Sequence, residues 1–333
     1  MSDSTETNAD LAVDLSHVRK VYRGGVEALR GIKMDARRGE VFGLLGPNGA
    51  GKSTLVKIML TVVRATKARG TILGAPIGTK STLEKVGYLP EKHRFPEYLT
   101  GRQAIEFSGA MCRMPRAASR VRTGELLALV GMTDWADRKV STYSKGMMQR
   151  IGIAAAMVND PDLVVLDEPT DGVDPIGRRD IRDVLVRIRE RGVCVFLNSH
   201  LLSELEMVCD RVAILVQGSV AAQGTIDELT AESRRYELVI RGTPPPWCEE
   251  GGLRVETDAD GRQALLAPQI DVEGLQPVID RLRSDDVEIV SIEQVRESLE
   301  DLFMRYVKDP LTGRSLPPGA ARTAPPTRPR SAS

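Results

Sequence analysis

The sequence has few aromatic residues, no excess of either charge and no long apolar run. Only 4% of the 333 residues are aromatic, and 46 basic residues balance 46 acidic ones. This composition offers neither the positive field nor the stacking surfaces that nucleic-acid binding uses, so we expect no nucleic-acid partner. No apolar stretch approaches the ~18 residues that a membrane span needs. A role at a membrane would therefore come through a partner protein.

Cysteines are also few, and the first ten residues contain no apolar run. The four cysteines include no Cys-x-x-Cys pair, and none lies at metal-binding spacing from a histidine. We interpret them as isolated thiols in a reducing compartment. Residues 1–10 are rich in serine, threonine and acidic side chains. This composition predicts a disordered N-terminus rather than a signal peptide.

From residue 11 to residue 230, short apolar runs alternate with helical patterns. Continuous apolar runs of this length are typical of strands that are covered on both faces. The alternation predicts an α/β fold with a mainly parallel sheet. The strand-like runs are 41–45, 163–166, 193–197 and 212–216, and the helical patterns between them are 53–62, 147–158 and 176–189.

Two other regions differ from this alternation. Residues 99–146 lack strand patterns and are predicted to form a helical subdomain. Residues 231–308 are predicted to form a small accessory α+β domain, in which we find no catalytic group of residues. The predicted helices of the first region are 101–111 and 116–129; the accessory domain has predicted strands at 236–241, 264–266 and 287–292, and helices at 271–284 and 298–307.

The C-terminal residues 309–333 are predicted to be a disordered tail. The part from Leu311 onward contains five prolines and four arginines and no acidic residue. A solvated tail and a weak attraction to an anionic membrane surface are both compatible with this composition.

A glycine-rich loop follows the strand-like run 41–45 and precedes a helical pattern. It fits G-x-x-x-x-G-K-[ST], in the strand–loop–helix context that this phosphate-binding motif requires. Backbone N–H groups and the helix N-terminus would hold phosphate oxygens. Lys52 would reach the β and γ phosphates, and the Ser53 hydroxyl would ligate Mg²⁺. The expected ATP-binding residues of the loop are Gly46, Pro47, Asn48, Gly49, Ala50, Gly51, Lys52, Ser53 and Thr54.

Two acidic residues end the strand-like run 163–166. Asp167 comes first, at the carboxyl end of the run, where ligands bind in open α/β sheets. We expect it to hold Mg²⁺, directly or through water. Glu168 follows at once and is the candidate general base, because a carboxylate beside a γ-phosphate can take a proton from an attacking water.

The order of these motifs resembles that of the ATP-binding subunits of ABC transporters, especially exporter ATPases, over about residues 13–228. That family carries a Leu-Ser-Gly-Gly-Gln signature, and here residues 143–147 are Tyr-Ser-Lys-Gly-Met. Ser144 and Gly146 are retained around Lys145. The resemblance implies a P-loop NTPase core of the RecA-like type, with ATP and Mg²⁺ as cofactors. It also implies that the signature acts on the ATP of a second copy of the chain.

Further positions match the family or depart from it. Tyr22 occupies the place of the aromatic residue that stacks on adenine, and His200 the place of the switch histidine. Asp174 matches the aspartate of the loop that crosses to the partner copy. Glu91 departs, because the family usually has glutamine there; a carboxylate can still ligate Mg²⁺, but it adds negative charge near the γ-phosphate.

The resemblance implies an ATPase that energises transport, most simply export, through a separate polytopic membrane permease. The chain would work as a head-to-tail pair with two ATP molecules sandwiched between the copies, peripheral to the cytoplasmic face of the membrane. The alternatives are an importer or lipid-trafficking ATPase, and a soluble ABC protein acting on ribosomes or DNA. The soluble relatives carry two cassettes or a long coiled-coil insertion, which this chain lacks.

Overall fold

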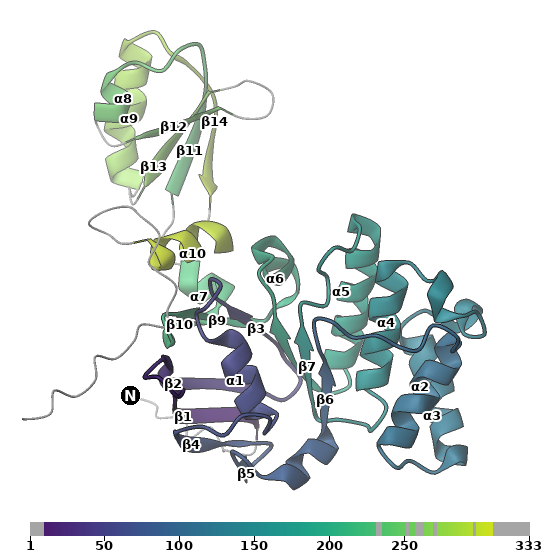
Figure 1. Ribbon diagram of the computed structural model, residues 1–333. Helices are drawn as coiled ribbons and strands as arrows, with labels where there is room; N and C mark the ends of the chain where they lie inside the picture. The colour runs from purple at the N-terminus through teal and green to yellow at the C-terminus, as the bar shows by residue number, and fades with distance from the viewer. Residues whose placement is uncertain are drawn as a thin grey trace, which may run out of the picture. The chain divides into compact units, whose positions relative to one another are not determined.

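The computed structural model describes residues 10–230, 235–250, 253–257, 263–268, 272–295 and 298–308 (Figure 1). The predicted tail 309–333 and nearly all of the predicted disordered N-terminus lie outside these residues. The chain divides into two compact units. One runs to Gly224 and takes up the chain again at Tyr306, and the other is Thr225–Arg305.

A six-stranded sheet forms the centre of the first unit and confirms the predicted α/β fold. From β9 through β3, β8 and β7 to β6 the neighbouring strands are parallel, and every residue of β3 and β8 is buried. The carboxyl ends of these strands therefore meet at one edge of the sheet. The strand order is β10 (Ser219–Thr225), β9 (Arg211–Val216), β3 (Val41–Leu45), β8 (Cys194–Asn198), β7 (Leu163–Asp167), β6 (Val86–Leu89).

Strands that lie before and after β3 in the sequence form a second, antiparallel sheet. This sheet was not predicted from the sequence. Its strands share one apolar core with the helix α1 (Lys52–Met59) and with β3 and β8. Side chains of β1 alternate only in part between core and solvent, and its register shifts several times, so the period-2 signal is weak. The strand order is β2 (Glu27–Arg37), β1 (Leu11–Val21), β4 (Lys67–Ile72), β5 (Ala75–Pro76).

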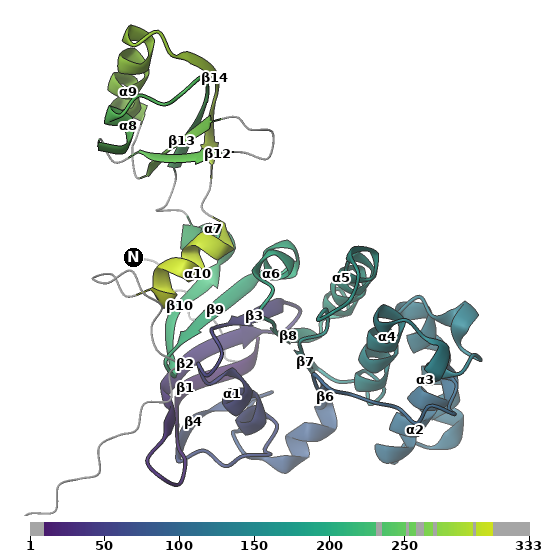
Figure 2. The same ribbon diagram turned by 45° about the horizontal axis from the view of Figure 1, so that its top comes forward.

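Helices cluster where the helical subdomain was predicted. In both views α2, α3 and α4 lie beyond β6 and β7 as seen from α1 (Figures 1 and 2). Thr100 begins α2 with a capping box, in which it exchanges hydrogen bonds with Gln103. The helices are α2 (Gly101–Met111), α3 (Arg116–Leu129), α4 (Lys145–Ala156), α5 (Pro175–Arg189) and α6 (Leu202–Val208), with short 3-10 turns at Lys80–Lys85, Thr133–Trp135 and Val140–Thr142.

The second unit contains a four-stranded antiparallel sheet over a small apolar core. Leu238, Leu265 and Leu282 are fully buried in it, and the Trp247 indole donates a 2.6 Å hydrogen bond to Asp285. The described elements, which include the predicted strands and helices and also β12 and α8, are α7 (Ile226–Thr230), β11 (Arg235–Arg241), α8 (Trp247–Glu250), β12 (Arg254–Thr257), β13 (Gln263–Pro268), α9 (Val272–Ser284), β14 (Glu288–Val295) and α10 (Leu299–Val307).

No helix among the described residues of either unit has the length and apolar character that crossing a membrane requires.

Candidate active site

The glycine loop connects β3 to α1 and turns tightly against neighbouring strands. Gly49 and Gly51 have φ values of +81° and +109°, which favour glycine. A Cβ on Gly51 would lie 2.6 Å from the Ala28 carbonyl oxygen and 2.7 Å from a Leu29 methyl carbon. The loop is therefore shaped by backbone packing as well as by its own turn.

Lys52 is held inside this loop. Its ammonium group donates hydrogen bonds to the carbonyl oxygens of Gly46 at 2.5 Å and Pro47 at 3.4 Å, and the residue is only 8% exposed. Burial lowers the pKa of Lys52, while the charges of Glu168 and Asp167 oppose that change. The lysine and the two strand-end acids that the sequence singled out thus lie within electrostatic reach of each other.

Tyr22 and the glycine loop line one cavity of about 290 Å³. The Tyr22 hydroxyl lies 3.4 Å from the Thr54 hydroxyl, and the Lys20 ammonium lies 4.8 Å from the centre of the Tyr22 ring. The tyrosine is 38% exposed, so part of its surface is available to a flat ligand. The structure therefore brings the predicted aromatic residue to the phosphate-binding loop, and Lys20 is a neighbour that the sequence did not indicate.

Gly51→Ala is expected to lower the free energy of unfolding by about 2–4 kcal/mol, because the new methyl group meets backbone and core atoms. Gly74→Ala is the matched control: Gly74 also has positive φ, at +79°, but has nothing within 4 Å of its Cβ position. There we expect a loss of only about 1 kcal/mol. Urea unfolding of the two variants measures the difference, and equal losses would contradict the close-packing account of the loop.

Asp167 and Glu168, at the end of β7, bond to different side chains. Asn198, at the end of the neighbouring β8, donates a 2.5 Å side-chain hydrogen bond to Asp167. Glu168 has φ +52°, an uncommon left-handed conformation for a residue with a side chain, and its backbone N–H donates to the Asn198 carbonyl oxygen at 2.8 Å. Asn198 thus orients both acids. The sequence did contain a signal for this role of Asn198, because a polar residue stands at the end of a buried strand, two positions before His200.

Glu168 and His200 are joined by a short hydrogen bond. His200 Nδ1 lies 2.7 Å from Glu168 Oε2, and the His200 backbone N–H donates to the same oxygen at 3.3 Å. Because a carboxylate accepts, the ring proton of this pair is on Nδ1. The Glu168 side chain is 13% exposed and the His200 side chain is 53% exposed. The histidine therefore fixes the carboxylate while much of its own ring stays open to solvent.

Glu91 follows β6, the strand beside β7, and adds a third carboxylate to this edge. Burial raises the pKa of Asp167, and the charges of Glu168 and Glu91 raise it further, whereas the Asn198 hydrogen bond lowers it. Burial and the charges of Asp167 and Glu91 also raise the pKa of Tyr88. The edge therefore concentrates negative charge, which suits a bound cation.

Asp167→Asn is expected to stabilise the protein, although it removes a site residue. Folding raises the pKa of Asp167, so its carboxyl contributes most stability while protonated below the unfolded pKa, and that contribution is lost as pH rises through the folded pKa. Asparagine keeps an oxygen for Asn198 and removes the buried charge. At neutral pH we expect Tm to rise by about 2–4 °C.

The gain in Tm of Asp167→Asn should shrink as pH is lowered toward the unfolded pKa of Asp167, because the wild-type carboxyl then becomes neutral as well. Calorimetry over a pH series in the absence of nucleotide measures this. Asp183→Asn, which changes an exposed carboxylate of α5, is the control and should leave Tm unchanged. A neutral-pH Tm that does not rise for Asp167→Asn would contradict the prediction.

The signature residues lie at the start of α4, beside α5 and not beside the glycine loop. Ser144 caps α4 by accepting from the Met147 backbone N–H, and Lys145 forms a 3.3 Å ion pair with Asp171. A Cβ on Gly146 would lie 3.2 Å from a methyl carbon of Val173 and 3.5 Å from the Gly177 Cα. Gly146 thus also serves the close approach of α4 to α5, a packing role that the sequence analysis did not consider.

Asp174 stands at the N-terminus of α5, and its side chain makes no capping hydrogen bond. The residues after it form an ionic cluster that the sequence did not indicate. Arg178 donates to the Val173 carbonyl oxygen at 2.8 Å and lies 3.8 Å from Glu204, which Arg182 contacts at 3.3 Å. Glu204 is buried on α6, four residues after His200. The Asp174 loop and the His200 segment are therefore linked through charged side chains.

Comparisons with known proteins show the family of the chain. The family described as ABC transporter matches residues 29–171. An uncharacterized ABC transporter ATP-binding protein of Synechocystis is 38% identical, over 89% of this chain and 85% of its own length. A daunorubicin resistance ATP-binding protein of Streptomyces coeruleorubidus is 33% identical, over 90% of this chain and 97% of its own length.

A solved structure extends the likeness to the fold. The protein cbiO1 of Clostridium perfringens, described as part of the ABC transporter complex cbiONQ, superposes with a TM-score of 0.62 at 29% identity. The match covers 67% of this chain and 92% of that protein. The resemblance inferred from the order of the motifs is confirmed at the level of the family. The chain belongs to the ABC transporter family, as one of its ATP-binding and ATP-hydrolysing subunits.

Proposed function

We propose that this subunit works as a pair of identical chains that energise export through a separate membrane permease, with the predicted residues forming each ATP site. The observation that carries the catalytic part of the proposal is the 2.7 Å hydrogen bond between His200 and Glu168. The charges of Glu168 and Asp167 on this sheet edge act on Lys52 in the glycine loop. A carboxylate fixed in this way beside a phosphate-binding loop has the position of a general base.

In the proposed reaction, ATP lies along the glycine loop with adenine against Tyr22. Lys52 exchanges its loop carbonyl partners for phosphate oxygens and balances their charge. Glu168 takes a proton from a water molecule as the water oxygen forms a bond to the γ-phosphorus. The bond from that phosphorus to the bridging oxygen breaks, and ADP keeps the electron pair. His200 holds Glu168 in place and faces the γ-phosphate.

The donor set fits Mg²⁺ as a companion of ATP. Among the described residues no three His, Cys, Asp or Glu side chains gather into a protein-only metal site. Mg²⁺ is commonly held by one or two carboxylates with substrate phosphates and waters. Ser53 and Asp167, with Glu91 nearby, would supply the protein ligands, and the buried Asn198 Oδ1 without a protein partner could accept from a metal-bound water. The ion would neutralise phosphate charge.

The pairing of two chains is supported by where the signature lies. Lys145 and Gly146 contact their own Asp171 and α5, and the α4 helix lies beyond β6 and β7 from α1 (Figures 1 and 2). A head-to-tail second copy would bring Ser144 and its neighbours to the γ-phosphate from the opposite side. The Asp174 carboxylate, which makes no capping hydrogen bond, would meet the same partner. Each site would then close only when both copies bind ATP.

A groove between β6 and the helices α2 and α4 is the proposed contact for the permease. Its volume is about 330 Å³, and its lining includes Tyr88, His93 and Phe95, which are close to Glu91 in sequence, together with Met111. Met111 is 72% exposed. Exposed large apolar side chains beside a groove are typical of a protein interface. This contact would place the chain at the cytoplasmic face of the membrane.

Met111→Glu is expected to prevent co-purification with the permease from membranes while leaving ATPase activity of the isolated chain intact. When the permease docks, the introduced carboxylate would be buried without a partner, and this burial costs free energy. Val121→Glu on α3 is the matched control, since Val121 is 67% exposed and does not line the groove. Loss of co-purification in both variants, or in neither, would count against the groove as the docking site.

A further inference from the structure

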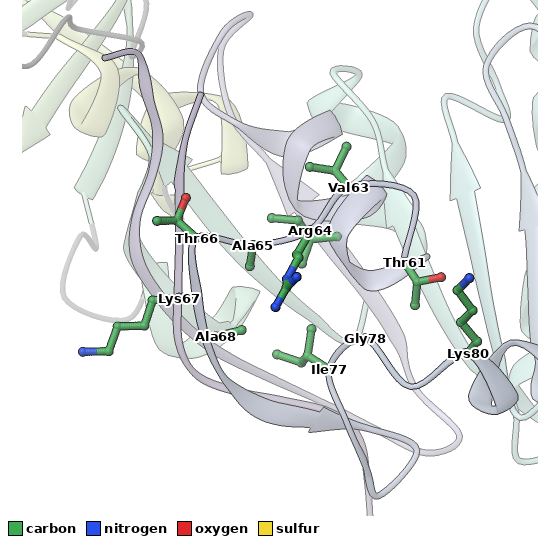
Figure 3. Close-up of a pocket in the computed structure, with 11 residues that line it drawn as sticks. Thr61, Val63, Arg64, Ala65, Thr66, Lys67, Ala68, Ile77, Gly78 and Lys80 are labelled. Carbon is green, nitrogen blue, oxygen red and sulfur yellow. The ribbon is translucent and has the colours of Figure 1, made fainter. Parts of the chain in front are cut away.

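A large pocket lies away from the glycine loop, between the C-terminal end of α1, loop 61–66, the strand β4 and the segment 77–80 that follows β5 (Figure 3). Its volume is about 570 Å³, against about 290 Å³ for the cavity at Tyr22. We call it the Arg64 pocket. A volume of this size is within the range of small-molecule sites.

The charged part of its lining has one sign. Of the described residues that line the pocket, Arg64, Lys67 and Lys80 are basic and none is acidic. Figure 3 shows the Arg64 guanidinium directed into the pocket and the Lys80 ammonium group beside Thr61, whereas Lys67 points away. Arg64 on one side, and Lys80 with the Thr61 hydroxyl on the other, therefore supply two cations and a hydroxyl to the pocket lining.

Apart from the basic residues and the threonines Thr61 and Thr66, the lining is apolar. Ile58 is only 2% exposed, and Val63, Ala65 and Ile77 pack against the core cluster of the first unit. Arginine presents a planar fork that matches the oxygens of a phosphate or carboxylate. An apolar wall next to such a fork suits a ligand with an anionic group at one end and a hydrocarbon body at the other.

Loop 61–66 is also tied to the Tyr22 segment. Lys20, whose ammonium group lies over the Tyr22 ring, donates to the Arg64 backbone carbonyl at 2.7 Å. Thr66 exchanges hydrogen bonds with both backbone groups of Val21, at 2.9 and 3.3 Å. A ligand that orders loop 61–66 would order the strand end that carries Tyr22 as well.

We propose that the Arg64 pocket binds an organic anion, a phosphate or carboxylate on an apolar body, and that its occupant strengthens ATP binding through loop 61–66. The second clause rests on the proposed nucleotide site, and the first does not. A ligand that orders a segment needed by a second ligand lowers the entropic cost of binding the second.

Calorimetric titration with phenyl phosphate tests the site, with all chains also carrying Lys52→Ala so that the glycine loop contributes little. We expect Arg64→Ala to weaken phenyl phosphate binding by about tenfold or more, because the variant loses a charge-assisted hydrogen bond to the phosphate. Arg69→Ala, on β4 but outside the pocket, removes the same charge and should bind normally. Equal affinity with and without Arg64, or equal affinity for inorganic and phenyl phosphate, would overturn the proposal.

Two sources could supply this chemistry, and vesicles separate them. Arg64-dependent sedimentation with phosphatidylcholine vesicles containing phosphatidic acid would support the site and assign a lipid headgroup. Phenyl phosphate binding without vesicle binding would support it and assign a soluble organic anion.

The linkage is measured with chains that retain Lys52. Saturating phenyl phosphate should tighten ATP binding about fivefold or more in the otherwise wild-type chain, and not in Arg64→Ala. Direct competition at the glycine loop would weaken ATP binding in both chains alike, and that result would overturn the linkage. Absence of ATP binding in either chain would contradict the proposed nucleotide site and would leave the phenyl phosphate result unaffected.

Discussion

Replacing Glu168 by glutamine is expected to slow ATP turnover by about 10²–10⁴-fold, the usual contribution of a positioned general base. Glutamine has the same shape, and its amide oxygen can still accept the hydrogen bond from His200 Nδ1 that spans 2.7 Å in the wild type. It cannot take the proton of the attacking water. Binding of ATP should be retained, because Glu168 is not expected to hold the phosphates.

Phosphate release measures the turnover of this variant, and light scattering measures its assembly. With hydrolysis blocked, ATP should accumulate the closed pair of chains, so mass should double on adding ATP and stay doubled. Glu190→Gln, which changes an exposed residue at the C-terminus of α5, is the control and should behave as the wild type. Wild-type turnover in Glu168→Gln would remove Glu168 from the role of base.

Lys52→Ala and Ser144→Arg chains, each nearly inactive alone, are expected to regain turnover when mixed. Lys52 would serve the ATP of its own glycine loop, and Ser144 the ATP of the partner copy. A mixed pair then has one site with both defects and one site with neither. Random pairing should restore about a quarter of the wild-type sites, since half the pairs are mixed and each has one complete site.

A second mixture makes this test specific. Lys52→Ala with Glu168→Gln combines two defects on the same side of the proposed site, so each site of the mixed pair keeps one of them and no rescue is expected. Differently tagged chains, purified through both tags, isolate the mixed pairs for phosphate-release assays. If Lys52→Ala with Ser144→Arg stays as inactive as the second mixture, the shared site is wrong.

The central sheet and the family of the chain could be predicted well from the sequence. Continuous apolar runs marked β3, β7, β8 and β9 because strands buried on both faces have no polar positions. The antiparallel sheet was missed for the opposite reason. Its half-exposed, bulged strands carry weaker patterns, and their pairing depends on contacts between residues far apart in the chain.

The sequence alone determined which chemistry this protein carries, because the glycine loop, Lys52 and the acids after β7 are local patterns with a local structural cause. Only the tertiary structure decided how these groups are held. Asn198 bonds Asp167, and His200 bonds Glu168. Both hydrogen bonds join segments that are distant in sequence, and no local periodicity records which side chains the packing of a sheet will bring together.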